Sequence, residues 1–226
     1  MSRDWIAVVA AALSVGSSRV AGVASVIFAA SLALAILTGQ AAALASDPED
    51  SVRSLYDTLL GTMKQGRILG ESGRFARIEP VIHRLFDIPF MARLAVGASW
   101  STLSPAQQQQ VTAAFGNYIS ATYAERFDNY AGQQMEVAGH QPSGSGVIVR
   151  TRIVKSSGEA VSIEYLMRQN DGAWQITDVY LDGSISQLAT QRSEFAAIMR
   201  REGFDGLLAT LNRKISLLTG NVAKAS

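Results

Sequence analysis

The spacing of apolar residues changes twice along this chain, and the order of these changes limits the folds that it can adopt. Helical spacing, with apolar residues three or four positions apart, runs from Pro48 to about Tyr130. From Met135 to Leu181 apolar residues mostly alternate with polar ones, as they do in half-buried strands. Helical spacing then returns. Helices followed by strands and again by helices predict an α+β fold rather than an alternating α/β sheet.

Proline residues mark where the expected helices of the first part begin. Asp47-Pro48 predicts a capping residue and a first turn, with acidic residues directly after it that suit a helix start. Pro80 and Pro89 each predict the start of a short helix. Ser104-Pro105 predicts a longer helix that runs to about Tyr130. The first part is therefore expected to be a set of helices with apolar faces.

The alternating segments predict a twisted antiparallel sheet of about four strands. Two strands are expected over residues 147–154 and 161–168, and Asn170-Asp171-Gly172 is a strong hairpin signal after them. The strand after this turn begins with Trp174 and Ile176 pointing to one face and ends with apolar residues of the opposite parity. A β-bulge near Thr177-Asp178 would place both pairs on the same face.

The last part predicts two helices that are separated by Gly203. The first is expected to run to about Arg201, and Asp205 is expected to cap the second. We expect residues 46–220 to form a single domain and residues 221–226 to be a frayed tail.

Residues 1–45 have the three parts of a secretory signal. Arg3 precedes an uncharged apolar run from Val20 to Leu37, and Ala43-Leu44-Ala45 offers small side chains at a cleavage site. We expect cleavage after Ala45 and export of the remaining chain. The alternative is a retained anchor, because a run of about 18 residues is close to the shortest that spans a bilayer.

The charge balance of the exported part gives no support to nucleic-acid binding. Without Arg3, Asp4 and Arg19, the 20 basic and 19 acidic residues of the full chain fall to 18 of each, and the net charge is zero. Nucleic-acid binding needs a basic surface. The chain also has no cysteine, which excludes disulfides, thiol chemistry and cysteine metal sites.

Enzyme motifs are mostly absent from the sequence, and a lipid hydrolase, the remaining enzyme alternative, would need a histidine within reach of a nucleophile. The two histidines, His83 and His140, stand alone, and Ser143-Gly144-Ser145-Gly146 is typical of a flexible turn rather than a nucleophile elbow. There is no phosphate-binding GxxxxGK and no HExxH. Asp178 and Asp182 are four residues apart and are expected to be structural. The sequence predicts no catalytic residue, no metal site and no cofactor.

The segment from Tyr165 to Leu208 carries a combination of motifs that resembles a known family. The motifs are Tyr165-x-Met167, Gly172-x-Trp174, Asp178-Val179-x-Leu181-x-Gly183, Arg192-Ser193-x-Phe195 and Gly203-x-Asp205-x-Leu207. They resemble the MlaC or toluene-tolerance family of periplasmic lipid carriers. The resemblance implies an NTF2-like or cystatin-like sheet packed with N- and C-terminal helices around an apolar cavity.

Some details depart from the phospholipid carriers of that family. Gln191 stands where an aromatic residue commonly precedes the family's arginine. The runs RLFDIPFMARLAVG, TYAERFDNYAGQ and QRSEFAAIMR resemble the hopanoid-biosynthesis-associated HpnM branch. That resemblance implies a periplasmic protein that moves a hopanoid between the inner and outer membranes together with an RND-type transporter. The alternatives are a phospholipid carrier of the MlaC type, which would work with an ABC-type transporter, and a periplasmic adaptor that holds no lipid.

A lipid carrier needs a dry cavity. Moving a lipid with on the order of 30 apolar carbons from a membrane into water would cost more than ~20 kcal/mol of free energy, at about 0.8 kcal/mol per methylene. The candidate lipid-binding residues on helices are Phe90, Met91, Leu94, Phe115, Ile119 and Tyr123. Those on strands are Val149, Ile163, Tyr165, Met167, Trp174, Ile176 and Val179.

Overall fold

The computed structural model describes residues 47–220 of the 226-residue chain. The expected leader, its cleavage site and the expected tail lie outside these residues. Within the described part, no helix is both long and apolar enough to cross a membrane.

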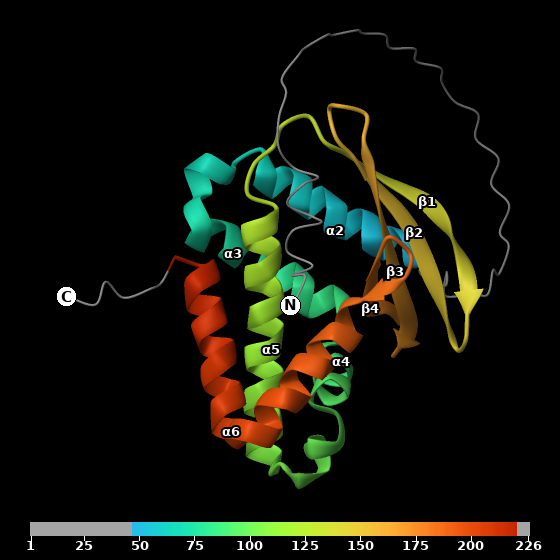
Figure 1. Ribbon diagram of the computed structural model, residues 1–226. Coiled ribbons are helices and arrows are strands. Elements are labelled where there is room, and N and C mark those ends of the chain that lie inside the picture. The colour runs from blue at the N-terminus through green and yellow to red at the C-terminus, as the bar shows by residue number, and fades with distance from the viewer. Residues whose placement is uncertain (1–46, 221–226) are drawn as a thin grey trace, which may run out of the picture.

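Five helices of α type and one antiparallel sheet make up the described part, in the predicted order (Figure 1). The helices are α2 (Pro48–Met63), α3 (Gly66–Leu85), α4 (Ile88–Val96), α5 (Pro105–Arg126) and α6 (Gln187–Leu218), with a 3-10 helix, η1, at Gly97–Thr102. The strands, which pair in sequence order, are β1 (Gln134–Ser143), β2 (Gly146–Val154), β3 (Ala160–Asn170), β4 (Ala173–Leu181) and β5 (Ile185–Ser186). The predicted α+β class is confirmed.

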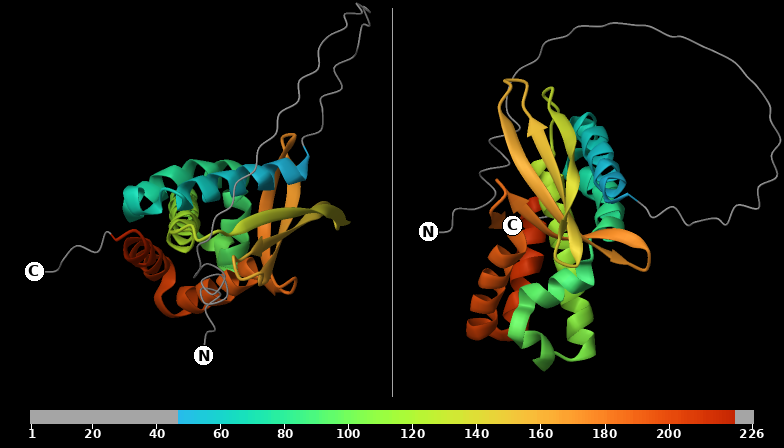
Figure 2. Two further views of the ribbon diagram at one scale, coloured as in Figure 1. Left: turned by 90° about the horizontal axis from the view of Figure 1, so that it is seen from above. Right: turned by 90° about the vertical axis from the view of Figure 1, so that its right-hand side faces the viewer.

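The helices cover one face of the twisted sheet, and the rest of the helical layer extends beyond it (Figures 1 and 2). The buried face of β2 and β3 is formed by residues that pair across the two strands, Val149 with Tyr165 and Ile153 with Val161. The residues between them, such as Arg150 and Arg152, are exposed. This is the alternation that a sheet with one packed face requires.

The predicted bulge in the last long strand is present. Leu166 pairs with Asp178 and Met167 pairs with Ile176, so Thr177 is the extra residue of β4. The bulge shifts the side-chain parity of β4 by one, and Ile176 and Val179 therefore both lie on the packed face. As a result, the side chains that β4 directs toward the helices are apolar both before and after the bulge.

Two helix boundaries differ from the sequence prediction. Pro80 lies inside α3 rather than at a helix start, although its ring removes one backbone hydrogen bond from that helix. The helix that starts at Pro105 ends at Arg126, earlier than expected, because the chain leaves helical geometry at Phe127. The predicted break at Gly203 is confirmed, since its φ of 67° interrupts α6 and divides it into two helical parts.

Candidate functional site

An apolar cavity lies where α4, α5, β4 and the first part of α6 meet. Its enclosed volume is about 50 Å³, and the space between its walls is about 490 Å³ when the solvent at its opening is counted. The residues that line it are Phe86, Met91, Phe115, Tyr118, Ile119, Thr122, Tyr123, Val179, Gln187, Leu188 and Gln191. None of them is charged. We call this space the first cavity.

A second cavity of about 320 Å³, also counting open solvent, adjoins the first. It lies between the end of α5 and strands β3 and β4, and it is lined by Tyr123, Arg126, Phe127, Ile163, Tyr165, Val179 and Leu181. Tyr123 and Val179 line both spaces, so they form the wall between them.

Helix α5 reaches the cavities because its second half is buried on nearly every side. Phe115 makes an edge-to-face contact with Phe195 of α6, with ring centroids 5.7 Å apart. Tyr123 makes an edge-to-face contact with Phe86 and stacks on Phe127. These ring contacts hold α5 between α6 and the sheet and leave its remaining side chains to line the cavities.

Three buried tyrosines lie beside the second cavity. The Tyr56 hydroxyl is 2.5 Å from Thr151 Oγ1, which donates to the Ile163 carbonyl oxygen, so Tyr56 is the donor to Thr151. Burial raises the pKa of Tyr56 to about 12. Burial also raises the pKa values of Tyr123 and Tyr165 well above the usual range. These tyrosines are neutral hydrogen-bonding groups at neutral pH.

Asp178 fixes the junction between β4 and α6, which carries one wall of the first cavity. Its side chain accepts hydrogen bonds from the Leu188 backbone nitrogen at 3.0 Å and from Ser186 Oγ at 2.6 Å. Ser186 is the N-cap of α6 and accepts from the Ala189 nitrogen. Asp178 is only 6% exposed, so these bonds are shielded from water. The expected structural role of Asp178 agrees with this position.

We expect Asp178→Ala to lower the free energy of unfolding by about 2–4 kcal/mol, because it leaves the Leu188 nitrogen and the Ser186 hydroxyl without their acceptor. Urea unfolding followed by circular dichroism measures this change. Asp57→Ala, at an exposed position of α2, is the control and should change stability by less than about 0.5 kcal/mol. Equal stability of the two variants would show that the junction does not depend on the carboxyl group.

Seven of the thirteen candidate residues line a cavity. Met91, Phe115, Ile119, Tyr123 and Val179 line the first, and the second adds Ile163 and Tyr165. Their contact with lipid stays a prediction.

The other six candidates line neither cavity. Val149, Met167 and Ile176 are fully buried in the core, where they contact other side chains. Leu94 and Trp174 are half-buried against the same core. The ring of Phe90 lies under the guanidinium of Arg168, 3.7 Å from its centroid, and Arg168 also pairs with Asp87. Five of these six belong to the core or pack against it, Phe90 packs against Arg168 instead, and contact of all six with lipid stays a prediction.

Several lining residues were missed by the sequence analysis. The polar ones are Thr122, Gln187, Gln191 and Arg126, and the others are Phe86, Tyr118, Phe127, Leu181 and Leu188. The burial of Tyr118 and Phe127 follows from the apolar spacing of α5. Nothing in the local pattern marks the glutamines, because a polar residue at a helix start is normally solvated.

The histidines lie away from both cavities. His83 is exposed on α3, and its ring is close to Gly116 of α5, where a Cβ would be 2.8 Å from His83 Cε1. His140 is on β1. Neither histidine is among the residues that line the two cavities, so the geometry gives no support to hydrolysis there.

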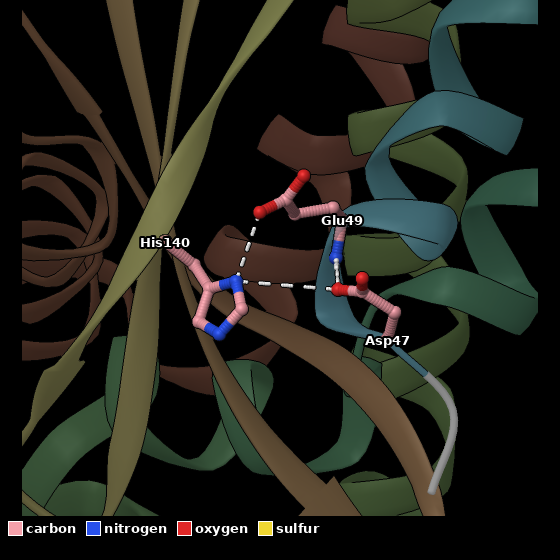
Figure 3. A group of neighbouring side chains, drawn as sticks. All are labelled: Asp47, Glu49 and His140. Atoms are coloured by element: carbon pink, nitrogen blue, oxygen red, sulfur yellow. Dashed lines mark hydrogen bonds and ion pairs between the residues drawn. The ribbon is translucent and has the colours of Figure 1, made fainter. Parts of the chain in front are cut away.

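His140 belongs to a group of side chains that the sequence analysis did not foresee (Figure 3). Its Nδ1 lies 2.9 Å from Glu49 Oε1 and 4.0 Å from Asp47 Oδ1. Asp47 is already the N-cap of α2 and accepts from the Glu49 backbone nitrogen. Each side chain thus has a structural partner, and the group joins β1 to the start of α2 at the protein surface.

Comparison with known proteins agrees with this architecture. The model of the MlaC protein family matches residues 53–213, well over half of the chain. The fold is also similar to that of a phospholipid-binding protein from Ralstonia solanacearum, which was solved in complex with a phospholipid. The TM-score is 0.67 at 24% sequence identity, over 76% of this chain and 99% of that one. This protein belongs to the MlaC family.

Proposed function

We propose that this protein is a periplasmic lipid carrier that holds the apolar part of a lipid in the first cavity. The observation that carries this proposal is the apolar, uncharged lining of a cavity between the sheet and the helices. A cavity of this kind replaces the water that lipid chains would otherwise contact. Membership of the MlaC family and the bound phospholipid of the similar structure support the same function.

Phospholipid is the better supported of the two lipid classes. The similar solved protein holds a phospholipid, whereas neither that structure nor the family model supports the HpnM branch or a hopanoid ligand. We therefore place the hopanoid second, on the three sequence runs that resemble that branch. An adaptor that holds no lipid is the third candidate, and the apolar lining of the first cavity favours a lipid carrier over it.

We also propose that the chain is cleaved after Ala45 and exported, and that the exported protein works with an inner-membrane transporter. A released carrier needs only comparable affinity for lipid in its cavity and in a membrane, so that it can load at one membrane and unload at the other. The net charge of zero after residue 45 suits such exchange, because strong attraction to anionic headgroups would keep the protein at one surface.

Native mass spectrometry of the protein purified from its own periplasm tests the proposal. We expect a bound species whose added mass equals that of a phospholipid, on a chain that begins at Ser46. A hopanoid mass would support the second ligand class. A ligand-free protein that also takes up no lipid from vesicles would exclude the carrier function, and a chain that still begins at Met1 would exclude cleavage.

A further inference from the structure

The lining of the first cavity suits the acyl chains of a phospholipid but not its phosphate. No lining residue is charged, and a phosphate that is taken out of water needs a cation beside it. The phosphate therefore lies outside the lining, at the surface of the protein. A cation on one of the elements that form the cavity walls would give the carrier a preference for phospholipids over uncharged lipids.

Few basic residues on the wall elements α4, α5, β4 and the first part of α6 lack an acidic partner. Arg126 of α5 pairs with Glu125 at 2.9 Å, and β4 contains no basic residue. In the first part of α6, Arg201 pairs with Glu202. Among the described residues of these elements, the basic side chains without a hydrogen bond or ion pair are those of Arg93, Arg192 and Arg200.

Arg93 and Arg192 lie on neighbouring helices and meet at the end of α4. Helix α4 packs beside the first part of α6 (Figure 1). Gly97 ends α4 and donates its N–H to the Arg93 carbonyl oxygen, so Gly97 and Arg93 are on the same side of the last turn. A Cβ at Gly97 would be 3.4 Å from Arg192 Nε, so the Arg192 side chain crosses this turn. Arg200 is about 12 Å further along α6.

Both arginines are exposed, and each is close in sequence to a residue of the cavity wall. Arg93 follows Met91 by two residues on α4. Arg192 follows Leu188 by four residues, so these two lie on the same side of α6. The two helices that supply apolar wall residues therefore also supply the two cations.

The positive charge of this pair is not balanced by acidic residues of the same segments. No aspartate or glutamate occurs between Ile88 and Ala124. Glu194, two residues after Arg192, pairs with Lys214 of the second part of α6. Guanidinium groups donate to phosphate oxygens in a bidentate geometry, and two of them can share one phosphate.

We propose that Arg93 and Arg192 bind the phosphate of a phospholipid whose acyl chains occupy the first cavity. The inference rests on the proposed carrier function, and it names the residues that make the carrier select a phospholipid. Both guanidinium groups donate hydrogen bonds to the phosphate oxygens at the protein surface. An uncharged lipid with the same acyl chains gains nothing from these cations and binds less tightly.

Two lipids with the same acyl chains test this assignment. Phosphatidylcholine vesicles that contain equal amounts of dioleoyl phosphatidylglycerol and 1,2-dioleoylglycerol are incubated with the full protein to equilibrium. The protein is then separated from the vesicles, and mass spectrometry gives the ratio of bound phosphatidylglycerol to bound diacylglycerol. Because this ratio is taken at equilibrium, it reports contacts with the carried lipid, whereas docking at the vesicle surface changes only the rate of uptake.

A double variant assigns the preference to the two arginines. Arg93→Gln with Arg192→Gln should lower the ratio about fivefold relative to the wild type, because each exposed ion pair contributes little. Arg67→Gln with Arg213→Gln, at exposed positions of α3 and of the second part of α6, is the matched control and should keep the wild-type ratio. Arg192 also lies over the C-terminal end of α4, where a cation stabilises the helix. Uptake of diacylglycerol by the double variant shows that its fold and cavity are intact.

The outcomes separate the phosphate site from the carrier function. An unchanged ratio in the double variant would overturn the assignment and leave the carrier function standing. Slower uptake of both lipids at an unchanged ratio would place the phosphate contact at the vesicle surface, which also overturns it. Uptake of neither lipid by the wild type, nor of phosphatidylcholine itself, would overturn the carrier function together with this inference.

Discussion

Ile119→Trp should lower lipid affinity by about 50- to 100-fold while the protein remains folded. Ile119 is half-buried on α5 and lines the first cavity, so an indole at this position takes space from the ligand. A ligand that buries roughly 100 Å² less apolar surface loses about 2.5 kcal/mol of binding free energy. Each 1.4 kcal/mol corresponds to about a tenfold change in Kd. The measurement is lipid transfer from vesicles as a function of protein concentration.

Leu217→Trp is the control for this variant. Leu217 is 62% exposed near the end of α6, so the same indole is added without touching a cavity wall. Its affinity should equal that of the wild type. Urea unfolding of both variants checks that overpacking at Ile119 costs no more than about 1–3 kcal/mol. Wild-type affinity in the Ile119 variant would mean that lipid does not occupy the first cavity.

The sheet was the part of the fold that the sequence predicted best. Alternation identified β2, β3 and β4 but gave no bounds for β1. The parity change between Ile176 and Val179 was enough to place the bulge, because side chains in a strand have a strict period of two. Helix ends were predicted where a local conformation decides them, as at Gly203 with its positive φ. The prediction that a helix starts at Pro80 was wrong, because the residues around a proline do not show whether it lies at the start of a helix or inside one.

The cavity could be predicted only in part. Spacing shows which side chains face the interior, but Met167, which lines neither cavity, and Tyr165, which lines the second, lie on the same face of β3. The difference depends on how α4 and α6 pack against the sheet, which no local pattern contains. Gln187 and Gln191 were missed for a related reason, since Asp178 holds the start of α6 against β4 and buries them.

Three of the buried tyrosines, Tyr56, Tyr123 and Tyr165, predict how stability depends on alkaline pH. In the unfolded chain a tyrosine ionises near pH 10, whereas the folded protein holds Tyr56 protonated up to about pH 12 and raises the pKa values of Tyr123 and Tyr165 as well. A raised pKa in the folded state means that the unfolded state releases protons first. The stabilisation is therefore complete below about pH 10 and is lost as the pH rises toward 12.

We expect the protein to unfold cooperatively as the pH rises. The absorbance of tyrosinate should therefore increase over the same pH range in which the circular dichroism signal is lost. Each pH unit above 10 costs about 1.4 kcal/mol per buried tyrosine, so Tyr56 alone accounts for on the order of 2–3 kcal/mol by pH 12. Tyr56→Phe should reduce this pH dependence, whereas Tyr130→Phe, at an exposed ring, should leave it unchanged. If all six tyrosines ionised near pH 10 in a protein that stayed folded, the burial of these hydroxyls beside the second cavity would be contradicted.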